Sequence, residues 1–148
     1  GAFKKYNESA DSSVQIIKSD FIIAANDQTG NDEMLKQFKE SKVNLQVVRA
    51  LDTAVLIEKD QNTKAHGLIF PQKMMNDVLV VMDIGPGYIK EYNDKCENES
   101  DKILMFDRIV SVKGEVGKAA NLKKLLEKAT GKFQLGIQRP CPEQAFLA

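Results

Sequence analysis

The chain has 148 residues, with 21 basic and 21 acidic side chains and a formal net charge of zero at pH 7. This balance argues against the basic surface that binds nucleic acid or an anionic membrane, and no apolar run reaches the ~18–20 residues of a spanning helix. One histidine and two cysteines without CxxC spacing, Cys96 and Cys141, exclude a Cys/His zinc site and favour reduced thiols and a cytoplasmic location.

The first 50 residues combine helical and strand patterns. Met34, Leu35 and Phe38 are spaced as the inward face of an amphipathic helix. We expect four elements here: a short helix around Phe3 and Tyr6, a strand at Phe21–Ala25, a helix at Asp32–Ser41 and a closing strand at Val43–Val48.

The next part of the chain follows without a linker. The β-type runs Leu45–Ala50 and Thr53–Ile57 are separated by only two residues, so we expect two rigidly coupled units. Connections too short for crossover helices predict a mostly antiparallel α+β fold. The further expected elements are strands at Ala54–Glu58, Leu68–Phe70, Asp77–Ile84, Asp107–Lys113 and Phe133–Ile137, with helices at Tyr88–Tyr92 and from Ala119 to Ala129, before Pro140 and Pro142 end the fold.

The sequence repeats itself imperfectly at a distance of about 87 residues. Gly1–Asn7 (GAFKKYN) is similar to Gly87–Asn93 (GYIKEYN), and Asp20–Gly30 (DFIIAANDQTG) is similar to Asp107–Gly117 (DRIVSVKGEVG). Such a period is longer than the ~20–50 residues of solenoid repeats and indicates a tandem of small domains.

The second copy has upstream strands that the first copy lacks. We therefore expect the C-terminal half of a first domain in residues 1–50, a complete second domain in 53–139 and a C-terminal tail in 140–148.

These residues resemble a PDZ domain. In that family a long strand ends in a proline/glycine turn, which Gly85-Pro86-Gly87 matches, and a later strand is introduced by Gly-Asp and followed by Asn-Gly. Phe106 to Gly114 matches that strand, with Phe106 in place of the usual Gly and Lys113 in place of the usual Asn. The resemblance implies a small, partly open β-barrel or sandwich capped by two helices, present here in tandem.

The family binds the C-terminal tail of a partner protein as an added strand, in the groove between the second strand and the long helix. Its glycine loop gathers backbone N–H groups into a nest for the terminal carboxylate. The match to this loop is His66-Gly67-Leu68, so the resemblance assigns carboxylate binding to the amides of these three residues. His66 could also contact the carboxylate as a pH-sensitive donor, or be an ordinary surface residue.

The groove itself is assigned in the same way. On the strand, Phe70 would pair with the ligand backbone, and Leu68 and Phe70 would share one face that walls a pocket for the last ligand side chain. Lys123 could favour an acidic ligand side chain by at most about 1 kcal/mol if exposed. The resemblance thus gives groove residues Ile69, Phe70, Ala119, Lys123 and Leu126, with electrostatic support from Lys59 or Lys64.

Two classes of function remain after catalysis is set aside. The chain has no second histidine, no dinucleotide fingerprint and no paired-carboxylate motif, so we expect neither an enzyme nor a cofactor. One class is a peptide-recognition adaptor. The other is a structural part of a larger, assembled or domain-swapped complex, in which the groove is vestigial and neighbours cover Phe21, Ile23, Phe38 and Val47.

Overall fold

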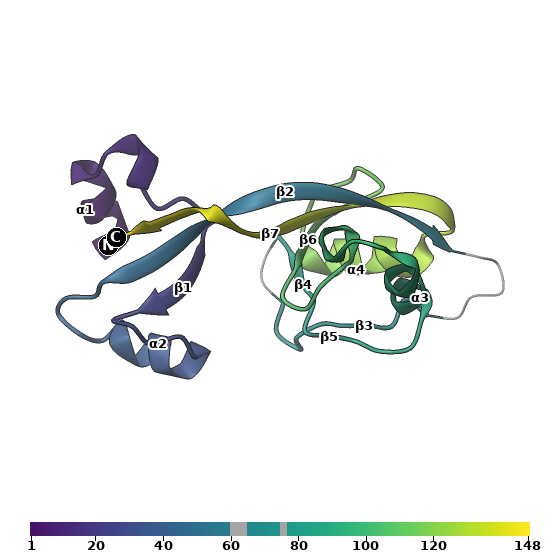
Figure 1. Cartoon of the computed structure of the whole chain (residues 1–148), viewed down its shortest axis with the longest axis horizontal. Helices are drawn as coiled ribbons and strands as arrows, with labels where there is room; N and C mark the ends of the chain where they lie inside the picture. The colour runs from purple at the N-terminus through teal and green to yellow at the C-terminus, as the bar shows by residue number, and fades with distance from the viewer. Residues whose placement is uncertain (60–64, 75–76) are drawn as a thin grey trace. The chain divides into compact units, whose positions relative to one another are not determined.

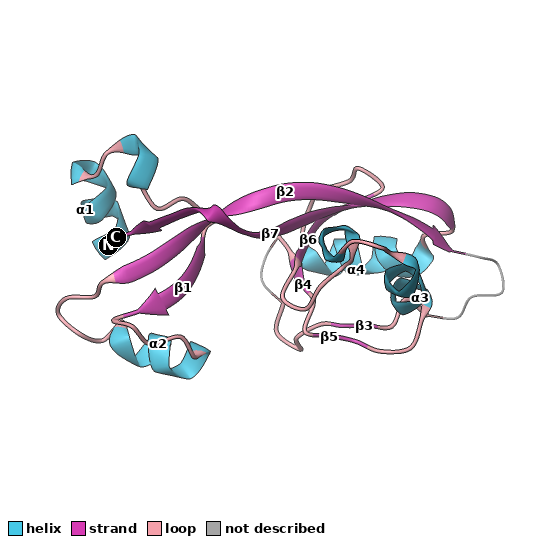
Figure 2. Cartoon of the chain, in the orientation of Figure 1, coloured by secondary structure: helices cyan, strands magenta, loops and turns pink. Residues whose placement is uncertain are grey.

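The structure is a computed structural model that describes residues 1–59, 65–74 and 77–148. The chain divides into two compact units: unit 1 comprises residues 1–51 and 140–148, and unit 2 comprises residues 52–139. The elements are drawn in Figures 1 and 2. The helices are α1 (Ala2–Ser9), α2 (Asn31–Gln37), α3 (Tyr88–Lys95) and α4 (Ala119–Lys128), with 3-10 turns at Ser12–Val14 and Glu99–Asp101, and the strands are β1 (Phe21–Ala25), β2 (Leu45–Lys59), β3 (Leu68–Ile69), β4 (Leu79–Val80), β5 (Asp83–Ile84), β6 (Arg108–Val112) and β7 (Gly131–Leu147).

Unit 1 contains the β1-β2-β7 part of a five-stranded sheet, whose full order is β1-β2-β7-β6-β4. Strand β1 pairs antiparallel with β2, with Ala25 opposite Leu45. On the other side of β2, Leu45 and Ala148 exchange two backbone hydrogen bonds of 2.8 Å. Residues 140–147 are therefore a strand of unit 1, where the sequence predicted a tail after Pro140 and Pro142. Two prolines are tolerated because this part of β7 lies at the edge of the unit 1 sheet, where a missing N–H costs little.

The hydrophobic core of unit 1 is small. Its buried members are Ala25, Leu45 and Val47, and Met34 packs against them from α2. The predicted inward position of the other two apolar residues of α2 is wrong, because Leu35 is 64% exposed and Phe38 is 40% exposed.

Unit 2 contains the β2-β7-β6-β4 part of the five-stranded sheet and a second sheet formed by β3 and β5. The strand predicted at Asp77–Ile84 is divided between them, with β4 in one and β5 in the other. The change falls between two neighbours: the Val81 N–H donates to the Asp107 carbonyl at 2.9 Å, and the Met82 N–H donates to the Ile69 carbonyl at 2.8 Å. A single apolar run thus supplies edge strands to both sheets.

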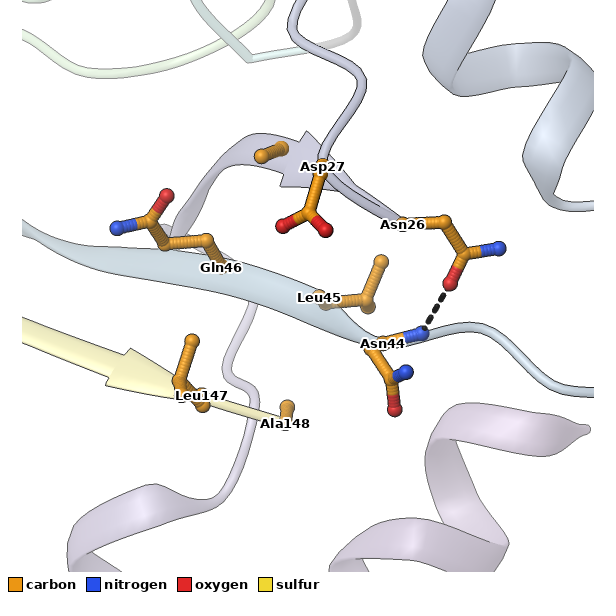
Figure 3. A pocket seen from close by; sticks show the side chains of 8 residues that line it. Asn26, Asp27, Asn44, Leu45, Gln46, Leu147 and Ala148 are labelled. Atoms are coloured by element: carbon orange, nitrogen blue, oxygen red, sulfur yellow. Dashed lines mark hydrogen bonds between the residues drawn. The ribbon is translucent and has the colours of Figure 1, made fainter.

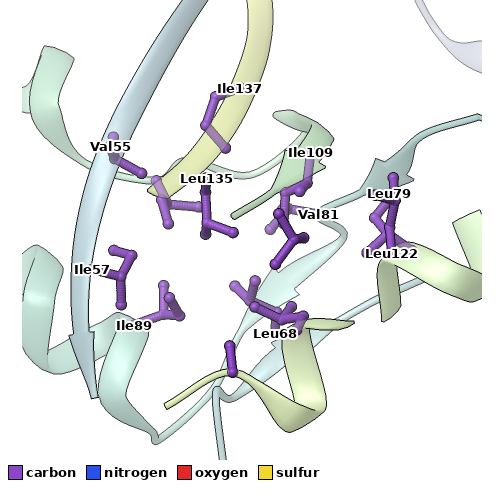
Figure 4. Close-up of a cluster of buried hydrophobic side chains, with 14 of the residues drawn as sticks. Val55, Ile57, Leu68, Leu79, Val81, Ile89, Ile109, Leu122, Leu135 and Ile137 are labelled. Carbon is purple, nitrogen blue, oxygen red and sulfur yellow. The ribbon is translucent and has the colours of Figure 1, made fainter. Parts of the chain in front are cut away.

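The core of unit 2 is extensive. Figure 4 shows side chains from both sheets and from the helices pointing into one cluster. Burial of each such side chain stabilises the fold by about 1.5–3 kcal/mol before entropy is subtracted. Its fully buried members include Ile57, Leu79, Val81, Ile89, Ile109, Leu122, Leu126, Leu135 and Ile137.

The two units contain the same buried ion pair. In unit 2 the Arg139 Nη2 lies 2.7 Å from Asp107 Oδ2, and in unit 1 the Arg49 Nη1 pairs with Asp20 Oδ2. Both carboxylates are buried, and each arginine also donates to backbone carbonyls of the preceding turn. The sequence repeat is therefore matched by a repeated polar network.

An asparagine bridge is repeated as well. Asn7 donates to the Ile16 carbonyl at 2.7 Å and accepts from the Ile16 N–H at 2.8 Å. Asn93 makes the equivalent pair of bonds with Ile103, at 2.8 and 2.9 Å. Each bridge ties the helix of its copy to the segment leading into the next strand.

Two departures from the expected motif residues keep the expected backbone. Phe106, in the place of glycine, has φ 70°, and Lys113, in the place of asparagine, has φ 56°. Glycine and asparagine adopt this left-handed region most readily. The backbone of the motif is thus kept at both positions although its residue types are not.

Candidate functional site

The predicted carboxylate-binding loop is packed closely against the Gly85-Pro86-Gly87 turn. Gly67 has φ +83°, and a Cβ atom there would lie 2.6 Å from the carbonyl oxygens of Gly85 and Pro86. A Cβ atom at Gly87 would lie 2.5 Å from the Ala65 carbonyl oxygen. Both glycines are needed because the two backbone segments touch. This close contact fixes the path of the chain into β3.

Strand β3 is paired on one edge only in the part of the chain that the structure describes. The carbonyls of Gly67 and Ile69 accept from the N–H groups of Gly85 and Met82, both at 2.8 Å. Because backbone groups alternate in direction along a strand, the N–H groups of the intervening and following residues, Leu68 and Phe70, are directed to the opposite, unpaired edge. That edge has the geometry that strand addition requires.

One of these N–H groups already has a partner. The Leu68 N–H donates to Nδ1 of His66 at 2.9 Å. The His66 ring lies between two aromatic neighbours, with centroids 5.8 Å from Phe70 and 6.5 Å from Tyr88. The sequence suggested His66 as a donor to a carboxylate, whereas here it is the acceptor for an amide that the carboxylate was expected to bind.

The predicted groove residues have unequal access to a ligand. Phe70 is half-buried against the unit 2 core, and Ile69, on the alternate face, is 51% exposed. On α4, Ala119 and Leu126 are buried in the core, and Lys123 is half-exposed. Of the predicted groove residues, only Phe70, Ile69 and Lys123 therefore have side chains that a ligand could contact in this conformation.

Charged groups surround His66 from two elements. Burial is the main cause that lowers the pKa of His66, and Lys123 and Lys59 lower it further, while Glu127 raises it. The Lys59 ammonium lies 5.6 Å from the centre of the Tyr88 ring. Lys64, the other predicted electrostatic residue, lies outside the described residues. The neighbourhood favours neutral His66 near pH 7.

Sequence reasoning missed two residues of this site. Glu127 was missed although it follows Lys123 by four positions, the spacing that places side chains on one helical face. Tyr88 was predicted only as the start of a short helix, not as part of the site. Its side chain is buried, its hydroxyl has no hydrogen-bond partner among the described residues, and burial raises its pKa to about 12.

A separate hollow of about 530 Å³ lies in unit 1. Figure 3 shows Asn26 and Asn44 beside it, where the Asn44 N–H donates to Asn26 Oδ1 at 2.8 Å. None of the predicted site residues contributes to it. Its lining residues are Ala24, Asn26, Asp27, Asn44, Leu45, Gln46, Leu147 and Ala148.

Other site classes have little basis in the described residues. They contain no cluster of three or more His, Cys, Asp or Glu side chains that could hold a metal ion. No helix among them has the length and apolarity to cross a membrane. Cys96 and Cys141 are both free thiols.

No protein-family model and no curated protein matches the chain. Several solved structures are similar to it, among them two of INAD PDZ45. The complex of INAD PDZ45 with NORPA CC-PBM has a TM-score of 0.50 at 19% sequence identity, covering 86% of this chain and 69% of that chain. INAD PDZ45 in complex with NG2 peptide has a TM-score of 0.49 at 18% identity, covering 86% and 68%. The first of these matches shows that the fold of this chain is PDZ-like, as its motifs predicted, and its sheets do not form a closed barrel.

Proposed function

We propose that this protein is a peptide-binding interaction module in which unit 2 captures the C-terminal tail of a partner protein. The observation that carries the proposal is the edge of β3 that no described strand pairs, beside a glycine loop held at φ +83°. A ligand strand adding to that edge would meet the N–H groups of Leu68 and Phe70. The similar INAD PDZ45 structures hold the NORPA CC-PBM and NG2 peptide, which supports the same class of function.

The carboxylate would lie at the start of β3. The amides of His66, Gly67 and Leu68 are consecutive there, and those of His66 and Gly67 have no backbone hydrogen-bond partner among the described residues. Successive amides that point to one spot bind anions. Lys59 and Lys123 add positive charge nearby. Phe70 and Ile69 would contact the ligand side chains, and Ala119 and Leu126 would support the groove from below.

The test is a fluorescence anisotropy screen with hexapeptides ending in Val, Leu or Phe, each with a free or an amidated C-terminus. We expect micromolar binding that amidation abolishes, with NMR shift changes confined to residues 65–70 and α4. Lys123→Ala should weaken binding by up to ~5-fold, the equivalent of 1 kcal/mol. Lys124→Ala is the matched control, since this neighbouring lysine is exposed. Equal affinity for both termini, or shifts elsewhere, would contradict the proposal.

We also propose that the two units are PDZ-like domains in tandem, the first represented by its C-terminal half. The repeated ion pair and asparagine bridge support this reading, because the same four residue types make the same bonds in each copy.

Unit 1 favours a second function, that of a component of a larger assembly. Its exposed apolar side chains include Phe3, Ile23, Leu35 and Phe38, and the rings of Phe3 and Phe38 meet edge to face at 6.2 Å. The exposed Phe3–Phe38 pair is an apolar contact surface, and exposed apolar patches mark interaction sites. Sedimentation equilibrium tests it: self-association that Leu35→Glu removes would support assembly, and a strict monomer up to high concentration would count against self-assembly.

A further inference from the structure

The hydrogen bond between Leu68 and His66 has a consequence for the proposed tail-binding site. The Leu68 N–H points to the unpaired edge of β3, where a tail carboxylate or backbone carbonyl would otherwise accept it. His66 Nδ1 occupies that acceptor position at 2.9 Å. The loop therefore caps one of its own binding amides with a side chain from two residues earlier.

The cap requires one protonation state. A backbone N–H can donate only to an imidazole nitrogen that carries no proton, so Nδ1 is bare and the proton of neutral His66 is on Nε2. In the imidazolium form both nitrogens are donors. The protonated ring cannot accept from Leu68, and the two N–H groups repel. Protonation of His66 is therefore incompatible with the capped loop.

The surroundings of His66 set the balance between the two forms. Lys59 approaches from β2, Tyr88 from α3, and Lys123 and Glu127 from α4. Tyr88 stays neutral over the physiological range because its pKa is raised to about 12. Glu127 is the acidic group among them, and it attracts a protonated ring toward α4. The protonated ring is therefore repelled by the Leu68 N–H and attracted by the Glu127 carboxylate.

We propose that His66 is an internal competitor for the tail-binding site, which blocks the Leu68 amide when neutral and frees it when protonated, so that affinity for carboxylate-terminated peptides rises as the pH falls from 7.5 to 5.5. This inference rests on the proposed function. The ligand carboxylate stays ionised over that range, since α-carboxyl groups titrate near ~3.5. Binding is coupled to proton uptake by His66, and the positive ring adds attraction for the carboxylate.

The cap is tested in the free protein by NMR, because His66 is the chain's one histidine and its imidazole signals need no separation from others. We expect the Nε2–H tautomer at pH 7.5. We also expect the Leu68 amide proton to move upfield on acidification, with the same midpoint as the ring. If the Leu68 amide shift does not titrate with the His66 ring, the proposal is overturned, regardless of the peptide-binding results.

The competition is tested with the same free-carboxylate hexapeptides at pH 5.5 and 7.5. Removing a competing hydrogen bond of about 0.5–1.5 kcal/mol corresponds to about a 2- to 10-fold gain in affinity. His66→Phe keeps an aromatic ring against Phe70 and Tyr88 but cannot accept a hydrogen bond. At pH 7.5 this variant should bind the peptides nearly as tightly as the wild type does at pH 5.5. It should lack only the part of the affinity that the positive ring contributes. Its affinity should not depend on pH.

Glu127→Gln is the second variant, and it separates the cap from its surroundings. This change should lower the titration midpoint of the His66 ring. The Leu68 amide should still titrate with the same midpoint as the ring. Affinity that is independent of pH in the wild type would overturn the competition. Absence of peptide binding at both pH values, with the Leu68 titration intact, would overturn the proposed function and the competition together but leave the capped loop established.

Discussion

Units 1 and 2 contain the same buried ion pair and the same asparagine bridge, but their hydrophobic cores differ greatly. Among the described residues, 17 buried hydrophobic residues form one cluster in unit 2, and three form the cluster in unit 1. The difference comes from residues 53–84, which supply the second part of β2 and all of β3, β4 and β5 to unit 2 and have no counterpart in unit 1. The polar network can thus form without the larger core, whereas burial of the helical faces depends on the strands that cover them.

The largest expected effect comes from breaking the ion pair in each unit. Arg139→Met should cost about 3–5 kcal/mol, because it leaves the buried Asp107 carboxylate without its guanidinium partner. Arg49→Met removes the equivalent partner of Asp20. Because unit 1 has the smaller core, we expect this change to unfold unit 1 while unit 2 stays folded. Urea unfolding with hydrogen exchange resolved by segment measures both.

The pH dependence of the stability loss in Arg139→Met tests whether the unpaired Asp107 carboxylate causes it. Burial is the main cause that raises the pKa of Asp107, and Arg139 opposes it. A carboxyl whose pKa is raised by folding binds its proton more tightly in the folded state, so the folded state gains stability as the pH falls through that pKa. Without Arg139 the pKa should rise further. The stability deficit of the variant should therefore shrink on acidification, and a deficit that grows would contradict the assignment.

A smaller effect is expected from matched helix positions. Leu126 and Phe38 are each seven residues after the first residue of α4 and α2. Leu126→Ala should cost about 2–5 kcal/mol because the side chain is fully buried. Phe38→Ala should cost below ~1 kcal/mol, since much of the ring is already exposed. Equal losses in equilibrium unfolding would show that something covers Phe38 in solution.

A modest effect is expected in the C-terminal half of β7. Phe146 packs against the unit 1 cluster, and the Arg49 guanidinium lies 4.7 Å from its ring centre. Phe146→Ala should destabilise unit 1 by about 1 kcal/mol and leave unit 2 unchanged. Gln144→Ala, an exposed change on the same strand, is the control. Faster hydrogen exchange in β1 would confirm the expectation, and an effect confined to unit 2 would contradict it.

Most helices and strands were predictable from local pattern. The stripe of α4 and the β-type runs of β1, β3 and β6 are strong local signals, and the structure has these elements near the expected bounds. The errors concern partners at long range. Residues 77–84 read as one strand because nothing local shows that Val81 and Met82 bond to different sheets. Residues 140–148 were predicted as a tail because prolines are tolerated in a strand only at the edge of a sheet. Nothing local shows that Pro140 and Pro142 lie at such an edge.

The candidate site was predictable to a similar depth. The need for Gly67 followed from the motif, and its φ and close backbone contacts agree with it. The occupant of the Leu68 amide was not predictable, because it depends on the rotamer of His66, which is set by Phe70, Tyr88 and the charges of α4. A motif identifies which amides point to an edge, and packing decides what they bind.

The make-up of unit 1 has a consequence for how the chain folds. Its two segments, 1–51 and 140–148, are separated in the sequence by the whole of unit 2. During synthesis residues 1–51 are made first but cannot form the Leu45–Ala148 hydrogen bonds until residues 140–148 are made. Contacts so distant in sequence form slowly because the intervening loop must first be closed, and a folded unit 2 shortens that loop. Unit 2 should therefore fold first and bring together the two segments of unit 1. Unit 1 begins earlier in the sequence but should complete its folding later.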